Sequence, residues 1–135
     1  MGSILLVEAE PEQHDRVAAA VREAGHEVLR EVTVRDAFSR TSEGGIDVIV
    51  IDAEPLVATE LARCLQALPD PPPLVLVSSS PTAPEISARI GAAAFLPKPF
   101  DASDLVAIIA RHVEPRPVRM FAEFEDEATD LVRDI

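Results

Sequence analysis

The middle of the chain reads DVIVIDAEP at residues 47–55. Together with residue 46, residues 48–51 make an almost continuous apolar run that ends at Asp52. A strand that is apolar at successive positions buries both of its faces, as the strands of a parallel sheet do between two layers of helices. We therefore expect residues 46–51 to form a central strand of an α/β sheet, with Asp52 at its carboxyl end.

Similar apolar runs lie on both sides of this strand, at residues 4–7, 28–32, 74–77 and 93–96. The segments between the runs carry apolar residues three or four positions apart, which is the spacing of a helix that packs one face on a core. Glycines such as Gly25, Gly44 and Gly91 mark turns between the segments. The helical pattern is weakest at residues 35–42. Five strand–helix units in this order predict a doubly wound parallel sheet with helices on both faces.

The composition agrees with one domain, which we place at residues 1–114. The chain has 135 residues and is 47% hydrophobic, which is enough to fill a single core. Its net charge of −12 repels nucleic acids and anionic membrane surfaces, and no apolar run approaches the ~20 residues of a membrane helix. Cys64 is the only cysteine, which fits a reducing cytoplasm. We expect a cytoplasmic domain that binds neither nucleic acid nor membrane.

Polar residues follow the apolar runs at the points where the strands should end. Because the carboxyl ends of parallel strands lie along one edge of the sheet, ligand-binding side chains gather there. The residues at these ends are Glu8, Glu10, Asp52, Ser78, Ser79 and Lys98. Lys98 is the only lysine beside eleven arginines, and its compact ammonium differs from a guanidinium in donor geometry and hydration. The sequence therefore predicts a functional cleft that contains Asp52 and Lys98.

Four motifs in this order resemble the receiver domain of bacterial response regulators. They are ILLVEAEP at residues 4–11, DVIVIDAEP at 47–55, PLVLVSSSP at 73–81 and GAAAFLPKPF at 91–100. The resemblance covers residues 4–113, and the last motif is its most specific part. It implies a flavodoxin-like (βα)5 fold with strand order 2-1-3-4-5, and a non-enzymatic role in two-component signal transduction.

The resemblance also implies roles for individual residues of the cleft. Asp52 matches the aspartate that accepts a phosphoryl group, and Lys98 matches the lysine that pairs with it and usually precedes a cis peptide, here at Pro99. Ser78 matches the hydroxyl residue that binds the phosphoryl group, and Phe95 matches the aromatic switch residue. Three of these residues also have a purely structural interpretation. Asp52 can close its strand as a turn residue, Lys98 can hold Asp52 as an ion pair, and Ser78 can cap the following helix or bond a turn.

The metal site that the resemblance implies is incomplete in this chain. Glu8 and Ala9 occupy the positions of two acids that hold a divalent metal, with Asp52 and the backbone carbonyl of Glu54 as further ligands. Magnesium requires hard oxygen ligands in near-octahedral geometry, and the side chain of Ala9 offers none. Whether Glu10 or Glu54 substitutes is left open by the sequence. We expect magnesium binding to be impaired, and phosphorylation of Asp52 with it.

Three classes of function fit these residues. The favoured class is a degenerate receiver-like module that acts through protein–protein interaction and is weakly phosphorylated or independent of phosphorylation. The alternative is an ordinary phosphoaccepting receiver that uses Asp52 with magnesium. Either would meet a histidine kinase or another signalling protein on the face of the fourth helix, fifth strand and fifth helix. The third class is a haloacid-dehalogenase-type phosphatase, but its aspartate belongs on the first strand, where this chain has Glu8, Ala9 and Glu10.

Residues 115–135 are predicted to form an acidic amphipathic extension. Pro115 and Pro117 should stop the fifth helix, because proline lacks an N–H and clashes with the preceding turn. Beyond them, apolar residues alternate at spacings of three and four: Phe121, Phe124, Ala128, Leu131 and Ile135. We expect residues 118–135 to dock on the domain or to contact a second copy or a parent protein, with a disordered acidic tail as the remaining alternative.

Overall fold

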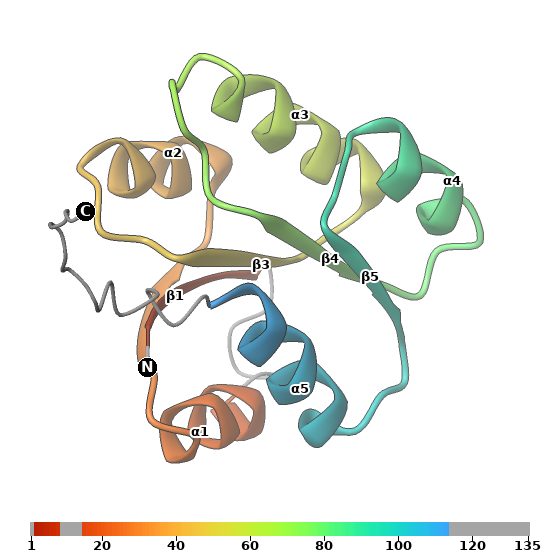
Figure 1. The fold of residues 1–135 in the computed structure, drawn as a ribbon. Coiled ribbons are helices and arrows are strands. Elements are labelled where there is room, and N and C mark those ends of the chain that lie inside the picture. Colours follow the sequence, from red (N-terminus) through yellow and green to blue (C-terminus); the bar gives the residue numbers. More distant parts are fainter. Residues whose placement is uncertain (1, 9–14, 114–135) are drawn as a thin grey trace, which may run out of the picture.

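The computed structural model describes residues 2–8 and 15–113 (Figure 1). Strands and helices alternate along this part of the chain, as the apolar runs predict. The elements are β1 (Ser3–Glu8), α1 (Asp15–Glu23), β2 (Glu27–Glu31), α2 (Val34–Ser42), β3 (Val48–Asp52), α3 (Pro55–Leu65), β4 (Leu74–Ser78), α4 (Ala83–Arg89), β5 (Ala94–Pro97) and α5 (Ala102–His112).

The five strands form one parallel sheet in the order β2-β1-β3-β4-β5. Helices α2, α3 and α4 cover one face, and α1 and α5 cover the other (Figure 1). The predicted flavodoxin-like fold with strand order 2-1-3-4-5 is therefore confirmed. Strand β3 lies at the centre, which explains why its sequence is apolar at successive positions.

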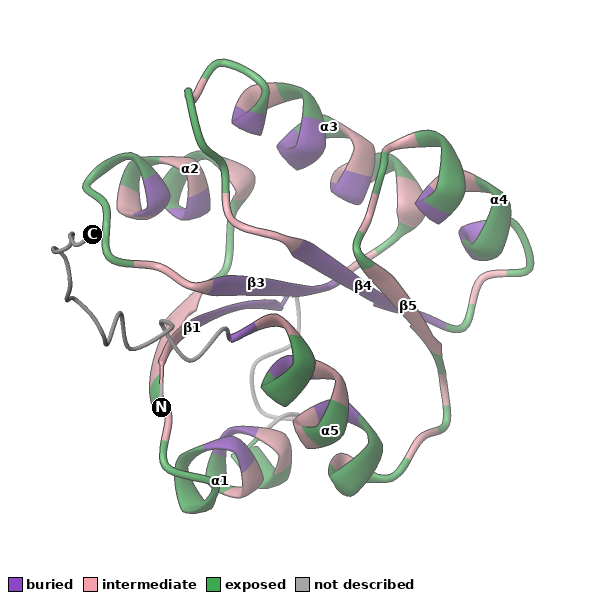
Figure 2. Cartoon of the chain, viewed as in Figure 1, coloured by how far each residue is buried: buried purple, intermediate pink, exposed green. Residues whose placement is uncertain are grey.

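Two hydrophobic clusters fill the space between the sheet and its helices (Figure 2). Side chains of a strand alternate between its two faces. Ile49 and Ile51 accordingly pack with the cluster under α2, α3 and α4, while Val48 and Val50 pack with the cluster under α1 and α5. All four are essentially inaccessible to solvent. This double burial fixes the register of β3, and with it the position of Asp52 at the end of the strand.

Helix α2 forms although its apolar pattern is the weakest of the chain. Only Ala37 and Thr41 are buried on it. Its start is fixed by Thr33, whose side-chain oxygen accepts a hydrogen bond from the backbone N–H of Asp36 at 3.0 Å. A side chain that caps the free N–H groups of a first turn stabilises a helix that buries little surface. The local capping signal thus compensates for a sparse apolar stripe.

Several predictions from the sequence fall outside the described residues. These concern Ala9 and Glu10 and the acidic extension at residues 115–135, and the domain boundary at residue 114 likewise stays a prediction. Within residues 2–8 and 15–113, no helix has the length and the apolar character needed to cross a membrane.

Candidate functional site

The carboxyl ends of β1, β3, β4 and β5 bring the predicted cleft residues to one edge of the sheet. Glu8 is the last residue of β1, and it is in register with Asp52, the last residue of β3. Ser78 ends β4, and its backbone carbonyl accepts a hydrogen bond from the Lys98 N–H at 3.1 Å. These four residues therefore lie together although up to 90 positions separate them in the sequence.

Asp52 and Lys98 form an ion pair at this edge of the sheet. The Lys98 ammonium nitrogen lies 2.8 Å from Asp52 Oδ1. Asp52 is only 8% exposed, while the Lys98 side chain is partly open to solvent. The expected cis peptide between Lys98 and Pro99 is present. A lysine in this position neutralises the buried carboxylate and joins the end of β3 to the segment after β5.

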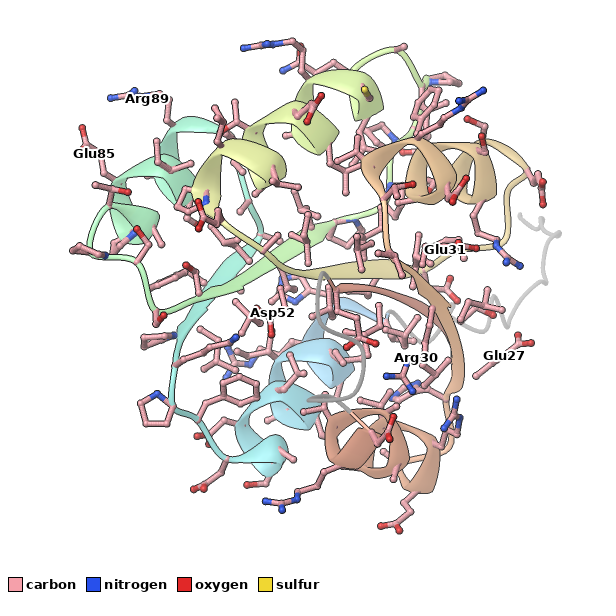
Figure 3. All side chains as sticks on the ribbon, turned by 180° about the vertical axis from the view of Figure 1, so that it is seen from behind. Glu27, Arg30, Glu31, Asp52, Glu85 and Arg89 are labelled. Carbon is pink, nitrogen blue, oxygen red and sulfur yellow. The ribbon has the colours of Figure 1, made fainter. Side chains whose placement is uncertain are left out.

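Glu8 is completely buried and is bound by an arginine that the sequence patterns did not reveal. Arg30 lies on β2, and its Nε donates a hydrogen bond to Glu8 Oε1 at 2.7 Å. Its Nη2 atom is also 2.7 Å from Glu8 Oε1, and its Nη1 donates to Asp15 Oδ1 at 2.9 Å. Figure 3 shows Arg30 on the side of the sheet where α1 lies. One guanidinium therefore joins the last residue of β1 to the first residue of α1.

The electrostatics of Arg30 follow from these contacts. Partial burial opposes the guanidinium charge, but hydrogen bonds and charge attraction from Asp15 and Glu8 outweigh it. The pKa of Arg30 is consequently raised above its usual value. Arg30 is a permanent cation next to the cleft. No pattern in the sequence marks this contact, because β2 is an edge strand, where charged side chains usually face solvent.

Ser78 and Phe95, the predicted hydroxyl and switch residues, lie in different surroundings. Ser78 is buried, and its Oγ accepts a hydrogen bond from the backbone N–H of Ser80 at 3.0 Å. This contact is the one expected of a serine that caps a turn. Because the Ser78 hydroxyl acts here as an acceptor, its proton can still be donated to another group. Phe95 is half-buried on β5 and packs against the cluster under α2, α3 and α4.

The backbone carbonyl of Glu54 takes part in helix α3. It accepts hydrogen bonds from the N–H groups of Val57 at 2.9 Å and Ala58 at 3.2 Å. Pro55 begins the helix immediately after this residue, since its fixed φ and missing N–H suit the first helical position. The Glu54 carbonyl is thus directed into the first turn of α3, and the Glu54 side chain is exposed.

The described residues do not fit a divalent metal as they are arranged. No group of three or more His, Cys, Asp and Glu side chains within residues 2–8 and 15–113 is placed to hold an ion. The Glu8 carboxylate is bound by Arg30, the Asp52 carboxylate by Lys98, and the Glu54 carbonyl by helix α3. Glu8 Oε1 and Asp52 Oδ1 therefore each contact a cationic side chain of the described residues, and the Glu54 carbonyl accepts two backbone N–H groups.

A hollow of about 390 Å³ lies at the other edge of the sheet, beside the carboxyl end of α3 and the start of β4. Its lining residues are almost all apolar: Ala62, Leu65, Gln66, Pro71, Pro72, Pro73, Leu74, Ile90, Gly91 and Ala93. Gln66 supplies the only polar side chain of this lining. Such a surface offers no acid, base or nucleophile.

No family model and no curated protein sequence matches the chain. Solved structures of the same fold include the chemotaxis protein CheY4 of Vibrio cholerae, which is 23% identical with a TM-score of 0.71 over 83% of this chain and 98% of that one. A response regulator of Thermotoga maritima is 20% identical, with a TM-score of 0.72 over 84% of this chain and 98% of that one. The receiver domain of the Francisella response regulator 1452 is 19% identical, with a TM-score of 0.74 over 84% and 97% of the two chains.

The structural neighbours are thus response regulator receiver domains, at identities of 15–24%. Likeness at this level of identity establishes the fold, and function has to be argued from the residues of the site. The resemblance drawn from the four sequence motifs is confirmed at the level of the fold.

Proposed function

We propose that this chain is a signal-transduction module with a receiver fold that acts by binding partner proteins, with weak or no phosphorylation at Asp52. It is a binding module and carries out no turnover of a substrate. One observation carries the proposal: the buried carboxylate of Glu8, at a position where the resemblance implies a metal ligand, is bound by Arg30. The cytoplasm is its predicted location, in line with the single cysteine.

The charges of the cleft explain why Asp52 is a poor phosphoacceptor in this proposal. Phosphoryl transfer to a carboxylate brings two anions together, so its rate depends on cations that neutralise the transferred group. Lys98 supplies one such cation, but Arg30 is held by Glu8 and Asp15. Asp52 then serves mainly as the buried partner of Lys98. Their ion pair holds the carboxyl end of β3 to the segment that follows β5.

The proposed partner surface is the face of α4, β5 and α5. Strand β5 is an edge strand of the sheet, flanked by α4 in one layer and α5 in the other (Figure 1). Lys98 directly follows β5, so the state of the cleft is connected to this face through the backbone. A histidine kinase or another signalling protein is the partner class we propose for it.

Intact-mass spectrometry tests the proposal. The full chain, incubated with acetyl phosphate and magnesium, should gain at most a trace of the roughly 80 Da that one phosphoryl group adds. Asp52→Asn is the matched control, because it removes the acceptor and keeps the size of the side chain. A large mass gain in the wild-type chain that is absent from Asp52→Asn would favour the alternative, an ordinary phosphoaccepting receiver that uses Asp52 with magnesium.

A further inference from the structure

Three neighbouring strands place Arg30, Glu8 and Asp52 on one face of the sheet. Arg30 on β2 is in register with Leu6 on β1, and Leu6 belongs to the cluster under α1 and α5. Glu8 lies two residues beyond Leu6, so its side chain emerges on the same face. Asp52 follows Val50 by two residues and shares that face as well. The Arg30 side chain can therefore extend along the face to the carboxyl edge, where it reaches Glu8.

The two carboxylates of this face would repel each other without cations. Glu8 and Asp52 are in register on adjacent strands, which lie about 4.8 Å apart in a sheet. Both side chains are buried, where the attraction or repulsion of charges is stronger than in water. Arg30 binds one carboxylate at 2.7 Å and Lys98 binds the other at 2.8 Å. Two anions are thus matched by two cations that both belong to the chain.

A guanidinium is well suited to this position. Its planar group of donors binds several oxygens at once, as it does here with Glu8 Oε1 and Asp15 Oδ1. The guanidinium is a permanent cation. A guanidinium is more weakly hydrated than a compact cation, and no chelator can remove it because it is part of the chain.

We propose that Arg30 is a built-in counter-cation: it neutralises the Glu8 carboxylate in place of a divalent metal. The arrangement of Glu8 and Asp52 then does not require a bound metal. The proposal rests on the proposed function in one respect, since it treats the cleft at Asp52 as the signalling site. A divalent cation bound by Glu8 would meet the positive charge of Arg30, which lies 2.7 Å from Glu8 Oε1. Restoring a carboxylate at residue 9 is then not sufficient for tight metal binding, because the positive charge of Arg30 also has to be removed.

Isothermal titration calorimetry of the full chain with magnesium chloride tests this account. The wild-type chain should give no saturable heat at millimolar magnesium. Ala9→Asp should bind magnesium measurably, because it returns an oxygen ligand. Ala9→Asp combined with Arg30→Met should bind at least about tenfold more tightly than Ala9→Asp alone, because the competing positive charge is gone. Far-UV circular dichroism checks that each variant is folded. If the variant with Arg30→Met does not fold, Arg30→Gln is used in its place.

Arg40→Met is the matched control in the Ala9→Asp background. Arg40 is another arginine with a carboxylate partner, Glu31, and its removal changes the net charge equally without touching Glu8. It should leave the magnesium affinity of Ala9→Asp within about twofold, because exposed charges act weakly over distance. Equal affinities with and without Arg30 would overturn the proposal, and so would tight magnesium binding by the wild-type chain. The mass measurement at Asp52 is a separate readout. A chain that binds magnesium tightly but gains no phosphoryl mass would overturn this inference alone, and a chain that gains the mass would overturn the proposed function.

Discussion

Replacing Arg30 with methionine should lower the free energy of unfolding by about 3–5 kcal/mol. Glu8 has 0% of its surface exposed, and Arg30 is a cationic partner of its carboxylate at 2.7 Å. Methionine keeps the apolar stem of the side chain but leaves a buried carboxylate without this compensating charge. Urea denaturation followed by far-UV circular dichroism measures the loss.

Two further variants make this result specific to the buried pair. Arg89→Met breaks the pair of Arg89 with Glu85 on the outer side of α4, where both side chains are about 70% exposed (Figure 3). It should cost about 0–1 kcal/mol, since exposed ion pairs contribute little. The double variant Arg30→Met with Glu8→Met should recover most of the lost stability, because an apolar pair often replaces a buried ion pair without cost. A double variant as unstable as Arg30→Met alone would contradict the pairing argument.

The second large effect is expected at the helix that packs behind β3. Leu61 lies on α3 with 0% of its surface exposed, in the cluster that contains Ile49 and Ile51. Leu61→Ala should cost about 2–5 kcal/mol, from lost burial and the cavity that remains. Thermal or urea unfolding measures the change.

Leu56→Ala provides the control for this core prediction. It makes the same chemical change on the same helix, but Leu56 is 80% exposed. It should therefore change stability by no more than about 0.5 kcal/mol. Equal losses from Leu56 and Leu61 would mean that the apolar cluster under α3 does not hold the helix on the sheet.

The fold, and the edge of the sheet at which Asp52 and Lys98 lie, could be predicted because both follow from short-range patterns. Apolar runs marked the five strands, and the parallel arrangement put their carboxyl ends on one edge. Asp52 and Lys98 could accordingly be assigned to the same cleft before any contact was known. The ion pair between them, at 2.8 Å, agrees with that placement.

The partner of Glu8 could not be predicted in the same way. Arg30 stands on an edge strand, where charged side chains usually face solvent, and it is 22 positions away from Glu8. Its contact depends on the register between β1 and β2 and on one extended rotamer, and neither leaves a pattern in the sequence. The hydrogen bonding of the Glu54 carbonyl was easier to predict. Pro55 marks the start of a helix, and the first N–H groups of that helix donate to this carbonyl.

The most direct measurement of the central claim is a two-dimensional ¹H–¹⁵N nuclear magnetic resonance spectrum of the full chain. It is recorded before and after adding magnesium with beryllofluoride, which imitates a phosphoryl group on an aspartate. The account predicts that the amide signals of Glu8, Asp52 and Lys98 stay in place, because Arg30 and Lys98 already occupy the cleft carboxylates. Saturable shifts of these three signals that disappear in Asp52→Asn would contradict it.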